Sequence, residues 1–484
     1  MSFGKMDWRK KACAVCVLFA ATAMALPAQT YKVLYSFCTE AGCPDGSGLH
    51  GPLFQATNGG LYGTGQGGGT YESGTVFKIT TSGKATTVYN FCAENNCADG
   101  SWPISGVIQG SDGNFYGTTY YGGTPNYGTV FKMSATGTLT TLHTFCTVSG
   151  CPDGEYPASA LVQGSDGDLY GTASTGGGEF TQGTVFKVTR SGKFKTLYAF
   201  CPGGWTTSCT DGAEPSAGLV QASDGNFYGM TYGGGNYNGG TVFKITPNGA
   251  LTTLYSFPAD SYPYAGLVQG NDGNLYGTTT YGGPYTGGTV FEITLNGALT
   301  TLYSFCSQPE CADGLDPYAT LIQGTDGNLY GTTTGGGAGG GGTIFQITPS
   351  GTLTTLHSFC GQTPCSDGFD PSTGLVQDTN GALYGVTFSG GPYTGGIVYE
   401  LSMGLRPFVK TLPVAAKVGS AVKILGSNLT SATRVTFNGT VAVFTVVSRT
   451  LITTTVPTGA TTGKVVVVTP SRTLSSNVPF RVKP

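Results

Sequence analysis

Apolar and polar residues alternate in short runs along residues 31–402, and the runs recur in one order. In a single copy, residues 265–305, the runs read "AGLVQG", "NLYGTTT", "GGTVFEIT" and "LTTLYSF". Short alternating runs, rich in Val, Thr, Tyr and Phe and bounded by glycine, are typical of half-buried β-strands. The pattern therefore predicts four antiparallel strands in each copy.

The copies can be counted from a Tyr-Gly core in the second strand. Its tyrosines are Tyr62, Tyr116, Tyr170, Tyr228, Tyr276, Tyr330 and Tyr384. In each copy an Asn or Asp followed by Gly precedes this strand, which suits a tight hairpin turn. A spacing of 48–58 residues with four strands per copy is typical of β-propeller blades. We therefore expect an all-β chain with a seven-bladed β-propeller over residues 31–402.

The fourth strand indicates how the propeller closes. Its motif appears early, as "VLYSF" at residues 33–37, and is missing after the last third strand, "GIVYELS". We predict that residues 31–37 form the outer strand of the last blade, which removes an open sheet edge. An open solenoid is the competing arrangement, and it leaves this early strand without a role.

The pattern changes after about residue 402. Residues 405–484 contain no copy of the repeat, but they show short β-branched runs at even spacing. Such runs predict a small β-sandwich, which we expect to be a separate domain.

Both parts resemble known families. The stretch "LYGTTTYGGPYTGGTVFEITLNGALTTLYSF" resembles the GloVer tandem repeat of exported, choice-of-anchor bacterial proteins, and the likeness covers nearly all of residues 31–402. The stretches "KVGSAVKILGSNLTSATRVTFNGT" and "ITTTVPTGATTGKVVV" are similar to the immunoglobulin-like IPT/TIG domain. Neither family implies a single activity, and a fold by itself does not supply one.

Composition excludes some partners. Charged residues are 10% of the chain, the formal net charge is −3, and Lys and Arg cluster nowhere beyond the N-terminus. Nucleic acids and anionic membranes are bound through basic patches, so we expect neither as a partner. No motif requires a cofactor or a metal ion, and we predict none.

The N-terminus resembles an export signal. Four basic residues lie between positions 5 and 11, followed by the apolar run "ACAVCVLFAATAMAL". This run has the length of a signal-peptide core, with cleavage near Ala23, Ala25 or Ala28. We predict a signal peptide over residues 1–28 and a secreted or cell-surface protein without a membrane span in its mature chain. An uncleaved anchor is the alternative.

The twelve cysteines beyond this signal fall into local pairs. The pairs are Cys38 with Cys43, Cys92 with Cys97, Cys146 with Cys151, Cys201 with Cys209, Cys306 with Cys311 and Cys360 with Cys365. An even number of cysteines in nearly identical contexts indicates disulfides formed in an oxidising compartment. Zinc binding is the rival interpretation, but the chain has only three histidines and the pairs lie on separate loops.

Long, variable loops are expected on one face of the propeller. Strand direction alternates, so the loops between strands two and three share a face with the cysteine-containing connections between blades. These loops contain Tyr120, Tyr121, Tyr127, Tyr232, Tyr237, Tyr281, Tyr285, Phe388 and Tyr393. Tyrosine suits flat, neutral, hydroxyl-rich partners such as polysaccharides. In the alternative interpretation the rings do no more than cover loop backbone, and both interpretations stay open.

A glutamine ends the first strand of every copy. The residues are Gln55, Gln109, Gln163, Gln221, Gln269, Gln323 and Gln377. They could line a central channel, but we favour hydrogen bonds between neighbouring blades, because buried amides need partners.

No catalytic set stands out. His143 and His357 replace the tyrosine of the fourth strand and are predicted to pack there, while His50 lacks a partner in the sequence. Two carboxylate pairs, Asp313 with Asp316 and Asp367 with Asp370, could supply oxygen ligands or acid–base groups, although Asp beside Gly or Pro is also ordinary in turns.

Taken together, these patterns favour an exported, non-catalytic protein that binds an extracellular polysaccharide or surface protein through the loop-rich face. The alternatives are an extracellular carbohydrate-active hydrolase or lyase, favoured if carboxylates converge at one end of the channel, and a purely structural envelope protein. The sequence does not specify the ligand or the oligomeric state.

Overall fold

The computed structural model describes residues 29–179, 181–203 and 209–484. The predicted signal peptide therefore lies outside the described residues. Short strands dominate, and the helices are single 3-10 turns, η1 (Asn95–Cys97), η3 (Pro309–Cys311) and η4 (Leu429–Ser431). Across the described ranges, no helix is long and apolar enough to cross a membrane.

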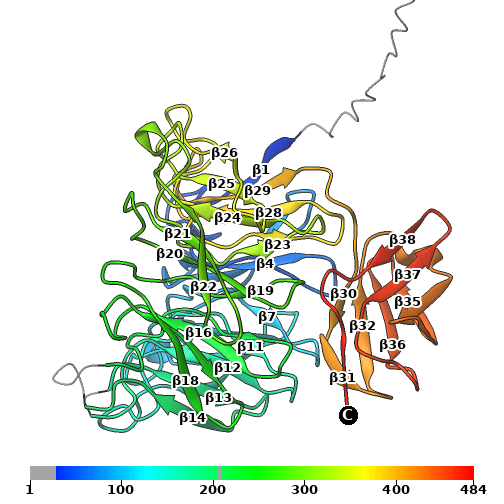
Figure 1. Cartoon of the computed structure of the whole chain (residues 1–484), viewed down its shortest axis with the longest axis horizontal. Helices are drawn as coiled ribbons and strands as arrows, with labels where there is room; N and C mark the ends of the chain where they lie inside the picture. Colours follow the sequence, from blue (N-terminus) through cyan, green and yellow to red (C-terminus); the bar gives the residue numbers. More distant parts are fainter. Residues whose placement is uncertain (1–28, 180, 204–208) are drawn as a thin grey trace, which may run out of the picture.

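Each sequence repeat forms its own antiparallel sheet, and the repeats are numbered 1 to 7 here in chain order (Figure 1). Repeat 1 contains β2 (Ser47–Leu49), β3 (Phe54–Gln55), β4 (Leu61–Gly67), β5 (Thr75–Ile79) and β6 (Ala85–Asn90). Repeat 2 contains β7 (Ile108–Gln109), β8 (Phe115–Thr119), β9 (Thr129–Met133) and β10 (Leu139–Thr144). Repeat 3 contains β11 (Val162–Gln163), β12 (Leu169–Ala173), β13 (Thr184–Val188) and β14 (Phe194–Ala199).

The later repeats follow the same order. Repeat 4 contains β15 (Val220–Gln221), β16 (Phe227–Thr231), β17 (Thr241–Ile245) and β18 (Leu251–Ser256). Repeat 5 contains β19 (Val268–Gln269), β20 (Leu275–Thr279), β21 (Thr289–Ile293) and β22 (Leu299–Ser304). Repeat 6 contains β23 (Ile322–Gln323), β24 (Leu329–Thr333), β25 (Thr343–Ile347) and β26 (Leu353–Ser358). Repeat 7 contains β27 (Val376–Gln377), β28 (Leu383–Thr387) and β29 (Ile397–Ser402).

The fourth strand of repeat 7 comes from the start of the chain. Strand β1 (Thr30–Ser36) pairs antiparallel with β29, in a register that runs from Thr30 opposite Ser402 to Ser36 opposite Ile397. The first and last described strands of the repeat region thus share one sheet.

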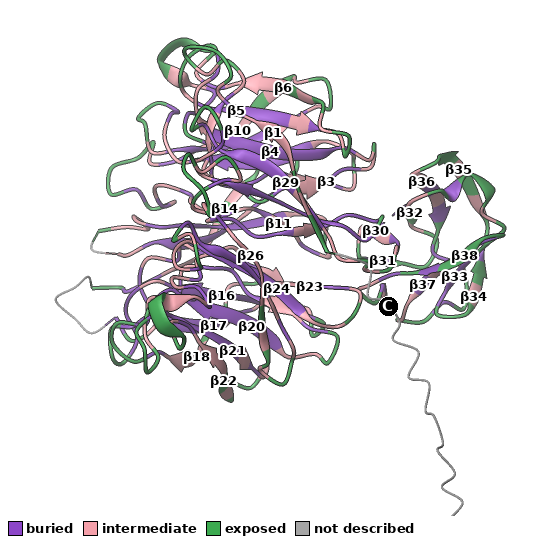
Figure 2. Cartoon of the chain, turned by 90° about the horizontal axis from the view of Figure 1, so that it is seen from above, coloured by how far each residue is buried: buried purple, intermediate pink, exposed green. Residues whose placement is uncertain are grey.

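Apolar side chains pack between consecutive sheets. The core between repeats 4 and 5, for example, joins Tyr228 and Val242 to Leu275 and Phe291. A matching core joins repeat 7 to repeat 1. Figure 2 shows the buried residues along the strands and the exposed residues mainly in the loops.

The glycine of the Tyr-Gly core is required by this packing. A Cβ atom on Gly277 would lie 2.7 Å from the ring of Phe291 and 2.8 Å from Leu267, closer than real contacts allow. The missing side chain therefore admits the phenylalanine of the third strand, which explains why every repeat keeps this glycine.

All six predicted disulfides are present in the described residues, which confirms that prediction and excludes the zinc interpretation for these cysteines. Each bond closes a loop within one inter-repeat connection. The bonds join Cys38 to Cys43, Cys92 to Cys97, Cys146 to Cys151, Cys201 to Cys209, Cys306 to Cys311 and Cys360 to Cys365.

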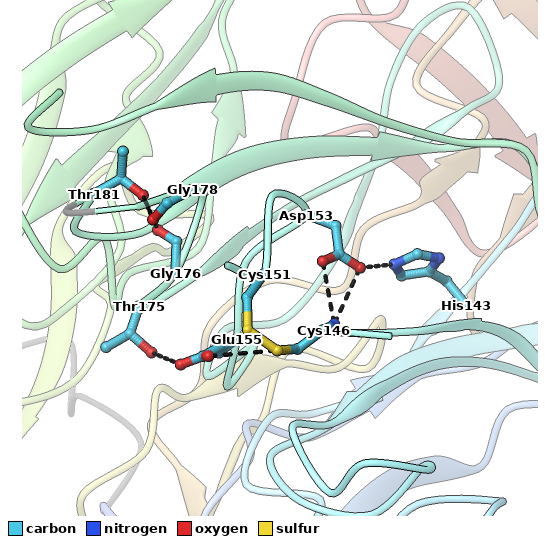
Figure 3. The surroundings of a disulfide bond; sticks show 9 residues. All are labelled: His143, Cys146, Cys151, Asp153, Glu155, Thr175, Gly176, Gly178 and Thr181. Carbon is cyan, nitrogen blue, oxygen red and sulfur yellow. Dashed lines mark hydrogen bonds and ion pairs between the residues drawn. A yellow bond between two sulfur atoms is a disulfide. The ribbon is translucent and has the colours of Figure 1, made fainter. Parts of the chain in front are cut away.

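A carboxylate supports each disulfide loop. In the connection after repeat 2, Asp153 accepts hydrogen bonds from the backbone N–H of Cys146 and lies 2.8 Å from Nε2 of His143 (Figure 3). In the connection after β1, Asp45 accepts in the same way from the N–H of Cys38. The closed loop is thereby held against the outer strand.

The C-terminal residues form two four-stranded sheets around one core. One sheet contains β30 (Lys410–Leu412), β32 (Ala421–Leu425), β36 (Leu451–Thr455) and β35 (Phe444–Ser448). The other contains β34 (Thr440–Ala442), β33 (Arg434–Phe437), β37 (Val465–Thr469) and β38 (Arg472–Ser475). Strands β31 (Ala415–Lys417) and β39 (Arg481–Lys483) pair in parallel. The core joins Ile424 and Ile452 to Phe437 and Val467, and we call this unit the C-terminal sandwich.

The C-terminal sandwich lies against one side of the repeat sheets (Figure 1). Its polar side chains form hydrogen bonds with residues at the turns between the first and second strands of the repeats. We call this side of the repeat sheets the turn face. The pairs are Lys423 with Ser111, Arg481 with Ala222, Lys464 with Asn271, Asn477 with Gln323 and Lys410 with Gln377. Five different repeats therefore contribute to this contact.

The net charges of the two parts favour the contact between the C-terminal sandwich and the turn face. Residues 403–484 contain ten Lys and Arg and no Asp or Glu, whereas residues 29–402 contain 25 Asp and Glu and nine Lys and Arg. Opposite net charges attract, so the small net charge of the whole chain conceals a basic unit on an acidic one, which the expectation of no Lys and Arg cluster beyond the N-terminus missed. The opposite side of the repeat sheets, formed by the strand two-to-three loops and the inter-repeat connections, is called the loop face.

Candidate functional site

At one equivalent position in each inter-repeat connection, beyond the disulfide-loop cysteines that also have positive φ, a residue on the loop face is held in a left-handed backbone conformation. These mouth residues are Gly48, Trp102, Tyr156, Glu214, Tyr262, Asp316 and Asp370, with φ between 45° and 60°. Side chains other than glycine rarely adopt this conformation, and such strain is often found at ligand sites.

Hydrogen bonds across repeats impose the strained conformation. The N–H of Asp316 donates to the carbonyl of Gly287 in the preceding repeat at 2.9 Å. Its own carbonyl accepts from the N–H of Thr334 at 3.1 Å. The backbone of each mouth residue is fixed by its neighbours, so the side chain is free to vary from repeat to repeat.

Aromatic rings gather around the mouth residues of repeats 2 and 3. Tyr120 stacks on Tyr156 with ring centroids 5.0 Å apart, and Tyr127 meets Tyr156 at 5.4 Å. Tyr121 lies edge-on to Trp102 at 5.3 Å. Three of the tyrosines predicted from the sequence therefore lie together here.

A second aromatic group lies in repeats 4 to 6. Tyr232 stacks on Tyr262 at 4.9 Å, and Tyr264 stacks on Tyr318 at 4.1 Å. Burial raises the pKa of Tyr120, and electrostatic interactions with Tyr121, Tyr264 and Glu214 raise it further. Because Tyr264 belongs to the second group, the two groups lie close enough to interact electrostatically. We call the two groups together the aromatic arc.

Of the remaining predicted tyrosines, three lie outside this arc and one belongs to it. Tyr237, Tyr285 and Tyr393 are 64%, 53% and 51% exposed, at equivalent positions in their loops. Tyr71 occupies the same position in repeat 1 and is 49% exposed; its loop reads differently in sequence, so it was not predicted. Tyr281 belongs with the arc, because its ring meets Tyr262 edge-on at 6.3 Å.

A cavity of about 270 Å³ opens beside the aromatic arc. Residues of repeats 1, 5, 6 and 7 line it: His50, Thr280, Tyr281, Asp316, Tyr318, Thr334, Asp370, Ser372 and Phe388. Burial raises the pKa of both Asp316 and Asp370. The cavity thus combines two carboxyl groups with hydroxyls and aromatic rings, and we call it the acidic cavity.

The carboxylate pairs expected from the sequence are divided by the fold. Asp313 is fully buried and accepts from the hydroxyls of Tyr303 and Ser307, so it supports a disulfide loop. Asp367 supports the next such loop by accepting from the N–H of Cys360. Asp313 and Asp367 therefore serve the disulfide loops, whereas Asp316 and Asp370, which come from adjacent repeats, line the acidic cavity.

The three histidines have distinct surroundings. His143 stacks on Phe194 at 3.7 Å and His357 on Tyr31 at 3.9 Å, which confirms their predicted packing role. His50 lines the acidic cavity, edge-on to Phe388 at 5.9 Å. Burial lowers the pKa of His50, so its ring is neutral at physiological pH.

The glutamines connect repeats, as favoured from the sequence. Gln323 Oε1 accepts from the N–H of Asn271 in the preceding repeat at 2.9 Å, and its Nε2 donates to the carbonyl of Gly327 at 2.9 Å. The same arrangement recurs in other repeats. The amides therefore hold the turn face together.

Two other clusters do not form a site. Cys146, Cys151 and Glu155 have the proximity of metal ligands, but the two sulfur atoms are joined in a disulfide (Figure 3). A cavity of about 380 Å³ lies beside the outer strand of repeat 4. Its one acid, Asp211, already accepts from Tyr198 and the N–H of Cys201.

These observations define an all-β protein of the β-propeller-like class, with a basic sandwich on its turn face and an aromatic, acidic site on its loop face. The chain belongs to the Gloeobacter/Verrucomicrobia repeat family, whose model matches residues 20–209, 204–312 and 259–443. Residues 410–482 match the IPT/TIG domain. No curated protein matches the chain in sequence.

Many solved structures resemble this chain, among them a lyase and an extracellular domain. Streptogramin B lyase is 16% identical with a TM-score of 0.52, over 78% of this chain and 98% of that chain. The extracellular domain of a B. thetaiotaomicron protein assigned as a hybrid two-component system is 12% identical with a TM-score of 0.49, over 94% of this chain and 58% of that chain. At such low identity the first likeness shows the fold alone, because one fold serves many activities.

The family, the TIG domain and the disulfides define the broad setting. Six disulfides indicate an oxidising compartment and hence an exported protein. A repeat of extracellular type combined with a TIG domain indicates a surface or interaction protein.

Proposed function

We propose that this chain is an exported, non-catalytic recognition protein that binds an extracellular glycan at its loop face. In this proposal the repeat sheets are the seven blades of one closed propeller over residues 31–402, and residues 405–484 form a second domain that blocks the turn face. A signal peptide over residues 1–28 directs the chain out of the cell. A surface protein is the alternative partner.

The observation that carries the proposal is the aromatic arc. Stacked pairs such as Tyr232 with Tyr262 and Tyr264 with Tyr318 present flat apolar area together with hydroxyl groups. Pyranose rings are also flat, apolar on one side and rich in hydroxyls, so the two surfaces are complementary. Because the C-terminal sandwich lies against the turn face, the loop face is the accessible end of the repeat sheets.

A carbohydrate-active hydrolase or lyase is the second candidate function, and one observation favours it. Asp316 and Asp370 share the acidic cavity, and burial raises the pKa of each. A general acid requires a carboxyl group with a raised pKa, and glycosidases use a pair of carboxyl groups. This candidate predicts that bound glycan is shortened.

The test is a panel of soluble polysaccharides applied to the purified mature chain, with retention and released products scored together. Tyr262→Ala removes a mouth residue of the arc, and Tyr285→Ala removes an exposed tyrosine outside it. We expect retention without products, reduced about tenfold or more by Tyr262→Ala and little changed by Tyr285→Ala, because stacking on an aromatic ring contributes on the order of 1 kcal/mol or more.

Each other outcome has a clear meaning. Release of shortened products would favour the hydrolase or lyase over the non-catalytic binding protein. Loss of retention with Tyr285→Ala alone would move the binding surface to the exposed tyrosines. No retention of any polysaccharide would remove the glycan proposal in favour of a protein partner.

A further inference from the structure

The acidic cavity contains polar atoms that lack partners. Asp370 Oδ1, Ser372 Oγ and Thr280 Oγ1 are buried, and none has a hydrogen-bond partner among the described residues. Thr280 is only 5% exposed, so its hydroxyl lies in the wall of the cavity. A buried polar atom without a partner is unfavourable, and a ligand that donates a hydrogen bond to it removes that cost.

The cavity also lacks a positive charge. In the part of the chain that the structure describes, no Lys or Arg lines it, and the carboxyl group of Asp316 makes no hydrogen bond or ion pair. His50, the remaining basic group in its wall, is neutral because burial lowers its pKa. Burial disfavours the charged form of each carboxyl group, and a cationic ligand in the cavity offsets that cost.

Aromatic rings complete the wall. Tyr281, Tyr318 and Phe388 line the same cavity as Asp316 and Asp370. Aromatic faces attract organic cations through their quadrupole, and carboxylates attract the same cations by charge. A primary ammonium group has three N–H donors, which matches two carboxylates and a hydroxyl as acceptors.

We propose that the acidic cavity binds the ammonium group of an unacetylated amino sugar within the glycan. This inference rests on the proposed function and names its substrate class. Tyr318 lines the cavity and also stacks on Tyr264 of the aromatic arc. The arc therefore holds neighbouring sugar rings while the amino group of one ring enters the cavity.

Size and net charge agree with this ligand. A volume of about 270 Å³ is slightly below the roughly 300 Å³ at which pockets for drug-sized ligands begin, so the cavity suits one sugar unit. The excess of acidic residues in the repeat region also attracts a cationic polymer over a neutral one.

The test compares two tetrasaccharides with one backbone, unacetylated and N-acetylated glucosamine oligomers, by calorimetry on the full mature chain. We expect the unacetylated oligomer to bind about tenfold or more tightly at roughly physiological ionic strength, where exposed charges are already screened. Asp370→Asn should abolish this preference, because Asn keeps the shape and tolerates the left-handed backbone but carries no negative charge. Asp168→Asn, on the turn face, removes the same charge elsewhere and should keep the preference.

A second variant, Asp316→Asn, guards against a folding defect in the first, and equal melting temperatures establish that both are folded. Equal affinity for the two oligomers would overturn the inference while leaving the glycan proposal intact. Preference that survives both variants would overturn it as well. Binding that requires calcium and is lost with a chelator would assign the cavity to a metal ion instead. Preference for a lysine-rich peptide over both oligomers would refute the amino sugar.

Discussion

The hydroxyl of Tyr276 donates to Oδ2 of Asp272 across 2.6 Å, and so joins the buried core of repeat 5 to its exposed first turn. The same bond recurs four residues apart in other repeats, with Tyr116 and Asp112 at 2.7 Å and Tyr228 and Asp224 at 2.8 Å. A tyrosine, unlike a phenylalanine, can fill the core and hold the turn at once.

Tyr276→Phe should therefore lower the free energy of unfolding by about 1–2 kcal/mol, since a hydrogen bond to a charged group is lost from a packed site. Tyr384 supplies the matched control, because its hydroxyl accepts from the neutral Asn380 at 3.3 Å. Tyr384→Phe should cost clearly less. Denaturant unfolding of both variants measures the difference, and equal losses would contradict the role given to the carboxylate.

Stability should fall steeply above about pH 10. Burial and then the neighbouring carboxylate raise the pKa of Tyr116, Tyr170 and Tyr276. In the unfolded chain tyrosine loses its proton near pH 10, so from about that pH upward the unfolded state is favoured. Below about pH 9 both states keep the proton, and these tyrosines contribute no such change.

The measurement is the urea midpoint followed from neutral to strongly alkaline pH, together with tyrosinate absorbance. Burial and the bond to Asp211 raise the pKa of Tyr198 to about 12, so in folded protein this hydroxyl should keep its proton up to about that pH. A urea midpoint that stays constant from about pH 9 to about pH 12 would speak against the prediction.

The C-terminal sandwich should detach when its basic contacts are reversed. Arg481 donates to the carbonyl of Ala222 and lies 3.4 Å from Gln221 Oε1, within electrostatic range of Asp224. Arg481→Glu puts a negative charge against these groups, and small-angle scattering should show a larger radius of gyration.

Arg434→Glu is the control for this experiment. Arg434 is exposed on β33, and the same charge change there should leave the scattering unchanged. About 1 M salt, where the Debye length is near 3 Å, should loosen the wild-type contact in the same direction. A radius that stays constant in Arg481→Glu would mean that apolar contact alone holds the sandwich.

The mouth residues should show a conflict between stability and binding. Asp316 has φ of 55°, and Gly48 occupies the equivalent place in repeat 1 with φ of 60°. Asp316→Gly removes both the strain and an unpaired carboxyl group, so it should unfold at the same temperature as wild type or higher. Asp316→Ala keeps the strain and should be less stable than the glycine variant by about 0.5–1 kcal/mol.

Both variants should lose the preference for the unacetylated oligomer. Thermal unfolding and calorimetry on the same preparations test the two parts together. An alanine variant more stable than the glycine variant would show that the backbone conformation carries no cost.

Local features of this chain could be predicted because they depend on nearby residues. The Tyr-Gly core, the Asp-Gly turns and pairs such as Cys306 and Cys311 act within a few positions of each other, so strands, turns and disulfides follow from spacing. The packing of His143 was likewise predictable, since it replaces a tyrosine at a repeated position.

The sites formed between repeats could not be predicted from sequence spacing. The residues of the acidic cavity are up to 320 positions apart in the chain, as for His50, Thr280, Asp316 and Asp370. The sequence around each of them is also typical of an ordinary turn in its repeat. Asp313 and Asp316 are three positions apart but face a disulfide loop and a cavity, because the backbone turns between them.

By itself, the sequence determined the repeat, its strands and turns, the disulfides, the two families and the uneven distribution of charge, since all of these are encoded over short distances. The tertiary structure alone decided that the basic sandwich lies on the turn face and that two carboxyl groups share a cavity with unpartnered hydroxyls. The physical reason is that successive sheets pack against each other, which places equivalent positions of neighbouring repeats side by side. Residues that are distant in the chain therefore lie close together on the loop face.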